Sequence, residues 1–251
     1  MNSENGFKDN FSTVAGGYSR HRPTYPDALF QWLASVAPRR EAAWDCACGN
    51  GQASAGLAAH FDHVCATDAS AKQIEQARPH PKIAYSIAPA ERTPFDDNSF
   101  DLVLVAQAAH WFDFDAFNAE VNRVGRAGGI LALAAYELHR VTPGIDAVTD
   151  RFYEPVLGPY WQPERRHIKA AYRDIRFPFK DIATPEFFMT AEWTAEDCIG
   201  YLKTWSSVSR YRKETGKNPL EDFTGPLRAA WGKEARTVRW PLALRAGTIG
   251  G

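Results

Sequence analysis

Three acidic residues each follow a short apolar run in the first half of the chain: Asp45, Asp68 and Glu91. Asp45 comes just before the glycines of "DCACGNG". In an open α/β sheet, ligands bind at the carboxyl ends of the strands, and glycine lets the backbone approach them closely. A carboxylate at that point would repel a pyrophosphate, so the pattern favours a ligand that carries a positive group.

S-adenosylmethionine fits this pattern, because it has an α-amino group and a carboxylate but no phosphate. The amine would pair with Asp45, and the carboxylate would approach backbone N–H groups at the positive end of the next helix. Asp68 would accept the ribose hydroxyls, and Glu91 would accept from the adenine amine. Each acid alone could be a helix cap, a turn former or a solvated loop residue, so the interpretation rests on all three together.

Strand and helix patterns alternate before and after these acids. Apolar runs predict strands near residues 42–46, 63–68, 82–88, 100–108 and 128–135, and helical spacing falls between them. This alternation predicts an α/β, Rossmann-like fold with a mostly parallel sheet and right-handed crossovers.

The second half of the chain is less regular. Aromatic and proline residues over 136–176 predict a helical cap inserted after the fifth strand. We expect one domain, with a core of about residues 38–135 and 177–246 behind an N-terminal segment of about 11–37. Thr194 and Asp197 predict a capping box, and Pro241 predicts a bulge in the last strand.

Composition restricts the partners. The 251 residues are 45% hydrophobic and carry a net charge of -1, so the sequence has no global field for nucleic acid or an anionic membrane. No apolar run approaches the ~20 residues that span a bilayer, and the N-terminus lacks a signal-peptide core. The four cysteines do not have zinc-site spacing, and we expect no metal and a reducing, cytoplasmic location.

Several motifs resemble those of the class I S-adenosylmethionine-dependent methyltransferases. They are the glycine turn, the Asp68 motif, "AERTPFDDNSFDLVLV" and "RVGRAGGILAL", in the family's order. A narrower resemblance, to the small-molecule branch that contains trans-aconitate methyltransferase, rests on "YSRHRPTYP", "QAAHWFD", "YLKTWSSVSRY" and "VRWPLALRAG". The resemblance implies seven strands with the last antiparallel, S-adenosyl-L-methionine as cofactor and S-adenosyl-L-homocysteine as product.

The family pattern implies a set of cofactor contacts when it is transferred residue by residue. Tyr18 and Arg22 would close over the cofactor from the N-terminal segment. The full implied set is Tyr18, Arg22, Asp45, Gly49, Asn50, Gly51, Asp68, Ala69, Ala90, Glu91 and Gln107. Ala47 departs from the pattern, because the family usually has glycine there. We expect Ala47 to keep a negative φ and to leave the pocket open.

Residues after the fourth strand would border the transferred methyl group. His110 is the candidate base or orienting residue, and Trp111 is a candidate pocket wall, although both could equally be core residues. A carboxylate acceptor needs no base at neutral pH, whereas a hydroxyl acceptor would need one. The cationic run over 165–169 could bind an anionic acceptor or form a solvated helix face.

These observations favour a methyltransferase that acts on a small molecule, with O-methylation of a carboxylate or other acidic group preferred. The alternatives are an NAD-dependent Rossmann oxidoreductase, a methyltransferase that acts on a macromolecule, and a non-catalytic binding module. The oxidoreductase is disfavoured by Asp45, and a nucleic-acid enzyme by the near-neutral charge. The oligomeric state and the acceptor atom are left open.

Overall fold

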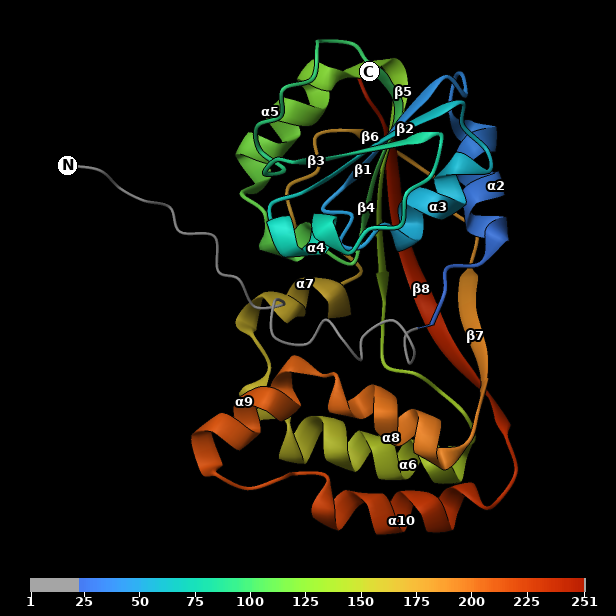
Figure 1. Ribbon diagram of the computed structural model, residues 1–251, viewed down its shortest axis with the longest axis vertical. Coiled ribbons are helices and arrows are strands. Elements are labelled where there is room, and N and C mark those ends of the chain that lie inside the picture. The colour runs from blue at the N-terminus through green and yellow to red at the C-terminus, as the bar shows by residue number, and fades with distance from the viewer. Residues whose placement is uncertain (1–22, 251) are drawn as a thin grey trace, which may run out of the picture.

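A computed structural model describes residues 23–250, so the predicted contacts of Tyr18 and Arg22 lie outside the described part of the chain. Its centre is a sheet whose strands follow the order β3-β2-β1-β4-β5-β8-β6 (Figure 1). The first five strands of that order are parallel: β1 (Ala42–Cys46), β2 (His63–Asp68), β3 (Ile83–Ile87), β4 (Phe100–Ala106) and β5 (Gly125–Tyr136).

Helices cover both faces of the sheet, as parallel strands require. Side chains of β1 alternate between two hydrophobic clusters, with Ala43 in one and Trp44 in the other. The first cluster includes side chains of α2 (Asp27–Val36) and α3 (Gln52–Ala58), and the second includes side chains of α5 (Phe114–Val124). The predicted α/β fold with a mostly parallel sheet is therefore confirmed.

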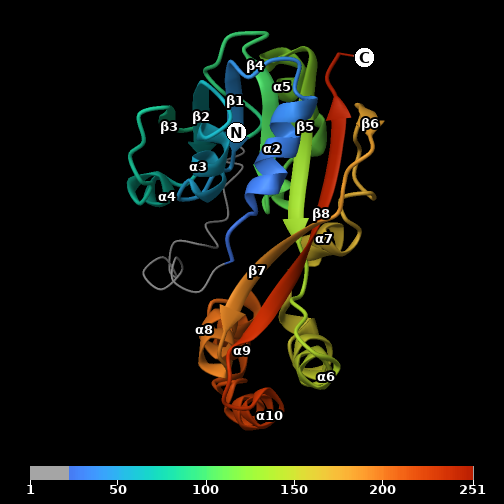
Figure 2. The same cartoon turned by 90° about the vertical axis from the view of Figure 1, so that its right-hand side faces the viewer.

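The last strand, β8 (Arg236–Thr248), is antiparallel and lies between β5 and β6 (Lys180–Ile182). The strand order given above contains the seven strands that we expected. An eighth strand, β7 (Phe187–Trp193), pairs with the first half of β8. Figure 2 shows β7 and β8 as a ribbon that runs from the sheet into a group of helices.

The bulge predicted at Pro241 was wrong, because β7 and β8 pair in continuous register through Phe188 and Pro241. Arg239 exchanges both backbone hydrogen bonds with Arg140, on the edge of β8 that faces away from β7. Alternate residues of a strand present their backbone groups to the same edge, so Pro241 also faces away from β7. Its missing N–H therefore removes no bond from the β7 ladder, and its carbonyl accepts from Glu137 N at 3.2 Å.

The helical lobe is built from two separate parts of the chain. The first part follows β5 and contains α6 (Pro143–Arg151), the π-helical turn η2 (Phe152–Val156), the 3-10 turns η3 (Gly158–Tyr160) and η4 (Pro163–Arg165), and α7 (Arg166–Lys169). The second part joins β7 to β8 and contains α8 (Ala195–Lys203), α9 (Ser206–Thr215) and α10 (Glu221–Trp231). Figure 1 shows α6, α8, α9 and α10 gathered below the sheet, so the lobe extends beyond the insertion over 136–176.

The carboxyl ends of the parallel strands face this lobe, as the arrowhead of β5 shows in Figure 2. Two short helices complete the sheet region: α4 (Ala71–Glu75) and the 3-10 turn η1 (Ala109–Trp111). The capping box of Thr194 and Asp197 opens α8 as predicted. Within residues 23–250, the helices are all too short or too polar to cross a bilayer.

Close packing of α2 on α3 gives the first prediction. A Cβ added at Gly56 would lie 2.1 Å from Cε2 of the buried Phe30, so Gly56→Ala must displace the Phe30 ring or separate the two helices. Overpacking of this kind costs ~1–3 kcal/mol, and we expect the free energy of unfolding in urea to fall by that amount. Gly144→Ala, where nothing lies within 4 Å of the added methyl, is the matched control and should be neutral or stabilising. Equal stability of the two variants would contradict the packing.

Candidate functional site

Asp45 is buried within β1, an interior strand of the sheet, with an exposed fraction of 0%. Ser54 Oγ, on the first turns of α3, donates a hydrogen bond to Asp45 Oδ2 at 2.5 Å. The other oxygen, Oδ1, is sealed from solvent and has no hydrogen-bond partner within residues 23–250. An unsatisfied buried carboxylate oxygen is costly, so this atom is available to a donor that residues 23–250 do not supply.

The pKa of Asp45 rises from 3.8 to about 7. Burial is the largest cause, the hydrogen bond from Ser54 opposes it, and the negative charge of Asp68 raises it further. A positive group placed beside Oδ1 would favour the ionised carboxylate and reverse this shift. The site therefore suits a cationic donor such as an ammonium group.

The turn after β1 reverses direction through left-handed backbone at Ala47, Gly49 and Gly51, whose φ values are 56°, 57° and 85°. The expectation of a negative φ at Ala47 was wrong. Cys48 N donates to the carbonyl of Thr67 at 2.9 Å, which holds the turn against β2 and overrides the local preference of alanine. The strain of an L-residue in this conformation is ~1–2 kcal/mol. The Ala47 methyl packs against the second hydrophobic cluster.

The two glycines of the turn have different surroundings. A Cβ at Gly51 would lie 2.3 Å from the hydroxyl of Tyr85. The glycine therefore leaves the space that the Tyr85 side chain, from β3, occupies. At Gly49 the nearest atom would be Gln73 Oε1 at 3.8 Å, which leaves ordinary space beside the backbone. Gly49 is thus the position where a ligand could approach the chain, whereas Gly51 is required by internal packing.

Asp68, at the end of β2, already braces the same turn. Its Oδ2 accepts from Gly49 N at 2.9 Å, and its Oδ1 accepts from Ser70 N at 2.8 Å. A carboxylate has about four acceptor positions, so these bonds are compatible with additional acceptance from a ribose. Ala69 and Asn50 are half-buried on either side of this contact.

Glu91 and Gln107 also have structural contacts. Glu91 Oε1 accepts from Asp113 N at 3.1 Å and so connects the loop after β3 to the start of α5, beside the buried Ala90. Gln107, with φ 64°, bridges β4 to β5: its Oε1 accepts from Tyr136 N at 2.8 Å, and its Nε2 donates to Tyr136 O at 3.3 Å. The structure brings the predicted residues of 45–107 together around the carboxyl ends of β1, β2 and β4.

His110 lies in η1, directly after β4, and is 8% exposed. Its Nδ1 is 3.2 Å from the hydroxyl of Tyr172, and its ring lies 4.5 Å from that of Trp111. Burial, then the charge of Arg165 and then His167, lower its pKa to about 3. The imidazole is therefore neutral at physiological pH and is too weak a base to take a proton from a hydroxyl.

Sequence reasoning missed Ser54 and Tyr172. Ser54 has a local signal, because it is a small polar residue on the buried side of the helix that follows the glycine turn. Tyr172 has none, because its partner lies 62 residues earlier in the chain.

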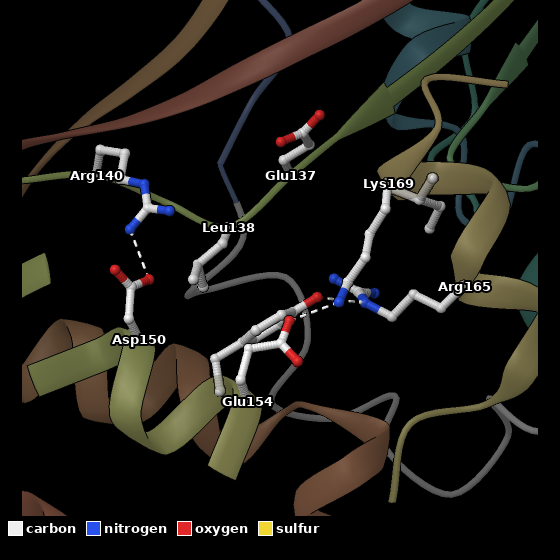
Figure 3. Close-up of a pocket in the computed structure, with 9 residues that line it drawn as sticks. Glu137, Leu138, Arg140, Asp150, Glu154, Arg165 and Lys169 are labelled. Atoms are coloured by element: carbon white, nitrogen blue, oxygen red, sulfur yellow. Dashed lines mark hydrogen bonds and ion pairs between the residues drawn. The ribbon is translucent and has the colours of Figure 1, made fainter. Parts of the chain in front are cut away.

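A cavity of about 320 Å³ lies where β5 leaves the sheet and enters the lobe (Figure 3). Its charged lining residues are Glu137, Arg140, Asp150, Glu154, Arg165 and Lys169. Arg140 pairs with Asp150 at 2.7 Å, and Lys169 pairs with Glu154 at 2.5 Å. Glu137 and Arg165 form no ion pair within the described residues.

Arg165 is held by aromatic contacts. Its Nε donates to the Tyr153 hydroxyl at 3.0 Å, and its guanidinium carbon lies 4.2 Å from the centre of the Trp161 ring. The charge of Arg165 lowers the pKa of His110, and η4, which ends at Arg165, lies against η1, so Arg165 belongs to both the cavity wall and the surroundings of η1. An arginine fixed in this way presents its remaining N–H donors to an anion with little loss of side-chain freedom.

Comparison with known proteins agrees with this geometry. Residues 44–133 match the family described as "Methyltransferase domain". A Dictyostelium discoideum protein described as a methyltransferase is 33% identical over 229 residues, which cover 90% of this chain and 87% of that protein. A solved structure from Anaeromyxobacter dehalogenans, described as a type II methyltransferase, is 47% identical with a TM-score of 0.87, and the match covers 91% of this chain and 98% of that one.

A more distant relative is the malonyl-[acyl-carrier protein] O-methyltransferase of Dechloromonas aromatica, which is 30% identical over 143 residues. That match covers 52% of this chain and 53% of the relative. The fold, the family match and the relatives together show that the chain belongs to the class I S-adenosylmethionine-dependent methyltransferases. This result excludes the NAD-dependent oxidoreductase that the glycine turn left open.

The buried charge of Asp45 gives the second prediction. Between pH 4 and 7, Asp45 is ionised in the unfolded chain but still protonated in the folded one, so the free energy of unfolding falls as pH rises through this window. At about 1.4 kcal/mol per pKa unit, the loss is at most about 4 kcal/mol. Asp45→Asn should therefore be more stable than wild type at pH 8 without ligand and similar to it near pH 4, as measured by urea unfolding.

Asp62→Asn removes an exposed acid near the end of α3 and is the control for a change in net charge. It should change stability little at either pH. If Asp45→Asn is less stable than wild type at pH 8, the carboxylate does not carry the burial cost that its surroundings indicate.

Proposed function

We propose that this protein transfers a methyl group from S-adenosylmethionine to a carboxylate or other acidic group of a small molecule. The observation that carries the acidic acceptor is the fixed guanidinium of Arg165, which has no acid partner among the described residues and whose charge lowers the pKa of His110. The resemblance to the branch that contains trans-aconitate methyltransferase agrees with such an acceptor. We place the reaction in the cytoplasm, where the four free cysteines would stay reduced.

The cofactor end of the site fits S-adenosylmethionine. Asp45 Oδ1 has no hydrogen-bond partner within residues 23–250, which suits the ammonium group of the methionine part. The open side of Gly49 suits its carboxylate, near Asn50 and Gly51. The ribose and adenine would contact the group that follows β2, β3 and β4, which consists of Asp68, Ala69, Ala90, Glu91 and Gln107.

When bound, S-adenosylmethionine supplies the methyl group from its sulfonium. The protein's part is to orient the acceptor and to exclude water, and such positioning can contribute ~7–11 kcal/mol toward the barrier. A carboxylic acid with a pKa near ~4 is already ionised at neutral pH, so no side chain has to remove a proton. A reaction that needs no base agrees with the low pKa of His110, which makes this residue unsuited to act as one.

The cavity provides the space for the acceptor. Its wall combines the cations Arg165 and Lys169 with the aliphatic side chains of Leu138 and Ile168. Small-molecule sites typically join apolar walls to a few fixed polar groups in this way. The Dechloromonas relative, by its name, is an O-methyltransferase of a malonyl group, and a related chemistry here would likewise present a carboxylate.

Loss of cofactor binding in Asp45→Asn is the third prediction. The neutral amide cannot form an ion pair with an ammonium group, so we expect affinity for S-adenosylhomocysteine to fall at least 10-fold in calorimetric titration. Asp62→Asn should bind as wild type does. Unchanged affinity in Asp45→Asn would show that Asp45 does not contact the cofactor. Because the same substitution should stabilise the unliganded fold, weaker binding could not be attributed to unfolding.

The fourth prediction concerns the product. A panel of small carboxylic acids, incubated with methyl-labelled S-adenosylmethionine, should give label that is released by mild base as methanol, which identifies a methyl ester. Base-stable label, or label that enters only protein or nucleic acid, would overturn the proposal in favour of another acceptor.

On the acid that is methylated best, Arg165→Gln should raise KM about 10-fold or more, because a charge-assisted contact contributes about 1.5–3 kcal/mol. kcat should change little, since the contact is made in both the ground state and the transition state. Arg166→Gln is the matched control: it removes the same charge at an exposed neighbouring position outside the cavity. If the two substitutions raised KM equally, the effect of Arg165 would come from the net charge of the protein and not from a direct contact with the acceptor.

A further inference from the structure

The contact between His110 and Tyr172 determines which nitrogen of the imidazole carries its proton. His110 Nδ1 lies 3.2 Å from the Tyr172 hydroxyl, and the two rings lie nearly parallel, at 19°. Both groups are uncharged, because burial lowers the pKa of His110 to about 3 and raises the pKa of Tyr172 above its ordinary value. One of the two must therefore donate a neutral hydrogen bond to the other.

Burial identifies the donor. Tyr172 is 1% exposed, and His110 Nδ1 is the hydrogen-bond partner that residues 23–250 give to its hydroxyl group. If Nδ1 donated, the phenolic proton would be buried without an acceptor, which is costly, so the hydroxyl donates to Nδ1. A nitrogen that accepts has no hydrogen, so the proton of the neutral ring resides on Nε2.

The backbone at Tyr172 shows that this placement is imposed by the fold. Ala171 and Tyr172 have φ values of 51° and 56°, which are unfavourable for residues with a Cβ. Tyr172 N donates to His167 O at 2.8 Å, and Tyr172 O accepts from Arg245 Nη1 at 2.6 Å. These bonds from α7 and β8 hold the strained residue so that its hydroxyl lies within hydrogen-bond distance of Nδ1. Strained residues of this kind concentrate at functional sites.

The opposite edge of the imidazole, which carries Nε2, is open to a hydrogen-bond partner. Nε2 has no hydrogen-bond partner within residues 23–250, and it is not among the side-chain atoms that are both sealed from solvent and unsatisfied. The charged or titratable groups that face the ring are Arg165, His167 and Tyr172. Within residues 23–250, no hydrogen bond joins any of these groups to Nε2, so the Nε2 proton is left for an incoming oxygen.

We propose that Tyr172 is a positioning residue that fixes His110 as the Nε2–H tautomer, and that this N–H donates a hydrogen bond to an oxygen of the methyl acceptor. The proton stays on His110 throughout, so the ring orients the acceptor and performs no acid–base step. This role rests on the proposed function, because it requires an acceptor with an oxygen that does not need deprotonation.

The tautomer is tested without turnover by ¹⁵N nuclear magnetic resonance of histidine-labelled protein. A protonated and an unprotonated ring nitrogen have well-separated shifts. Wild-type His110, assigned by its loss in His110→Gln, should show a protonated Nε2 and an unprotonated Nδ1 without titration from pH 5.5 to 8.5. Tyr172→Phe should move both nitrogens toward the averaged values of a mixed tautomer, whereas Tyr160→Phe, a lobe tyrosine outside this contact, should not. A protonated Nδ1, or titration near pH 6.5, would overturn the proposal.

Kinetics on the best carboxylic acid test the donor role. His110→Gln places an amide N–H near the position of Nε2 and should keep kcat/KM within about 5-fold of wild type, whereas His110→Ala should lose about 10–100-fold, as expected for a hydrogen bond to a charged group. Tyr172→Phe should fall between them, with KM more affected than kcat. Equal losses in His110→Gln and His110→Ala would overturn the donor role. If no acid is methylated, the proposed function fails, and the resonance experiment still decides the tautomer.

Discussion

A single buried carboxylate constrains the rest of this site. Asp45 lies in a strand that is paired on both sides, where an ionised group would be very costly without compensation. Ser54 satisfies one oxygen, and nothing in residues 23–250 satisfies the other. The fold therefore keeps a partly protonated acid that becomes a good ion-pairing group when a cation arrives. The cost in stability at this position agrees with the proposed role of Asp45, in which a cationic ligand would supply the missing partner.

The surrounding groups that could bind the cofactor also hold the backbone in place. Asp68 accepts from Gly49 and Ser70, Glu91 accepts from Asp113, and Gln107 bridges to Tyr136. These bonds fix the turn and the strand ends before any ligand binds, which is the preorganisation that a binding site needs. Substituting one of these residues would disturb backbone geometry as well as a proposed ligand contact. Within residues 23–250, Asp45 is the acid of this site that combines full burial with an oxygen lacking a hydrogen-bond partner.

Local patterns predicted the parts of the structure that local interactions determine. The individual strands and the capping box of α8 depend on residues that are close together in the sequence, and both were readable from it. The left-handed conformation of Ala47 was not, because a hydrogen bond from Cys48 to β2 overrides the preference of alanine. The regular pairing of β8 at Pro241 could not be predicted either, because it depends on which edge of β8 pairs with β7.

The acceptor end was the least predictable, and the reason is physical. The sequence shows a cationic run, but only the fold shows that Lys169 is neutralised by Glu154 while Arg165 has no acid partner within the described residues. The two segments that build the lobe meet through contacts such as α6 with α10, which are distant in sequence. Charge in the sequence therefore says little about specificity until the paired charges have been separated from the free ones.

The electrostatics of methyl transfer to a carboxylate explain why a neutral histidine suits this position. The sulfonium and the carboxylate are both charged at the start and both neutral at the end, so charge disappears as the reaction proceeds. A fixed cation bound to the attacking oxygen would stabilise the reactants more than the transition state and would slow the step. An uncharged N–H orients the same oxygen with a smaller penalty. Burial, assisted by the charge of Arg165, lowers the pKa of His110 and keeps the proposed donor neutral, while Arg165, held by Tyr153 and Trp161, would attract the acceptor to the cavity.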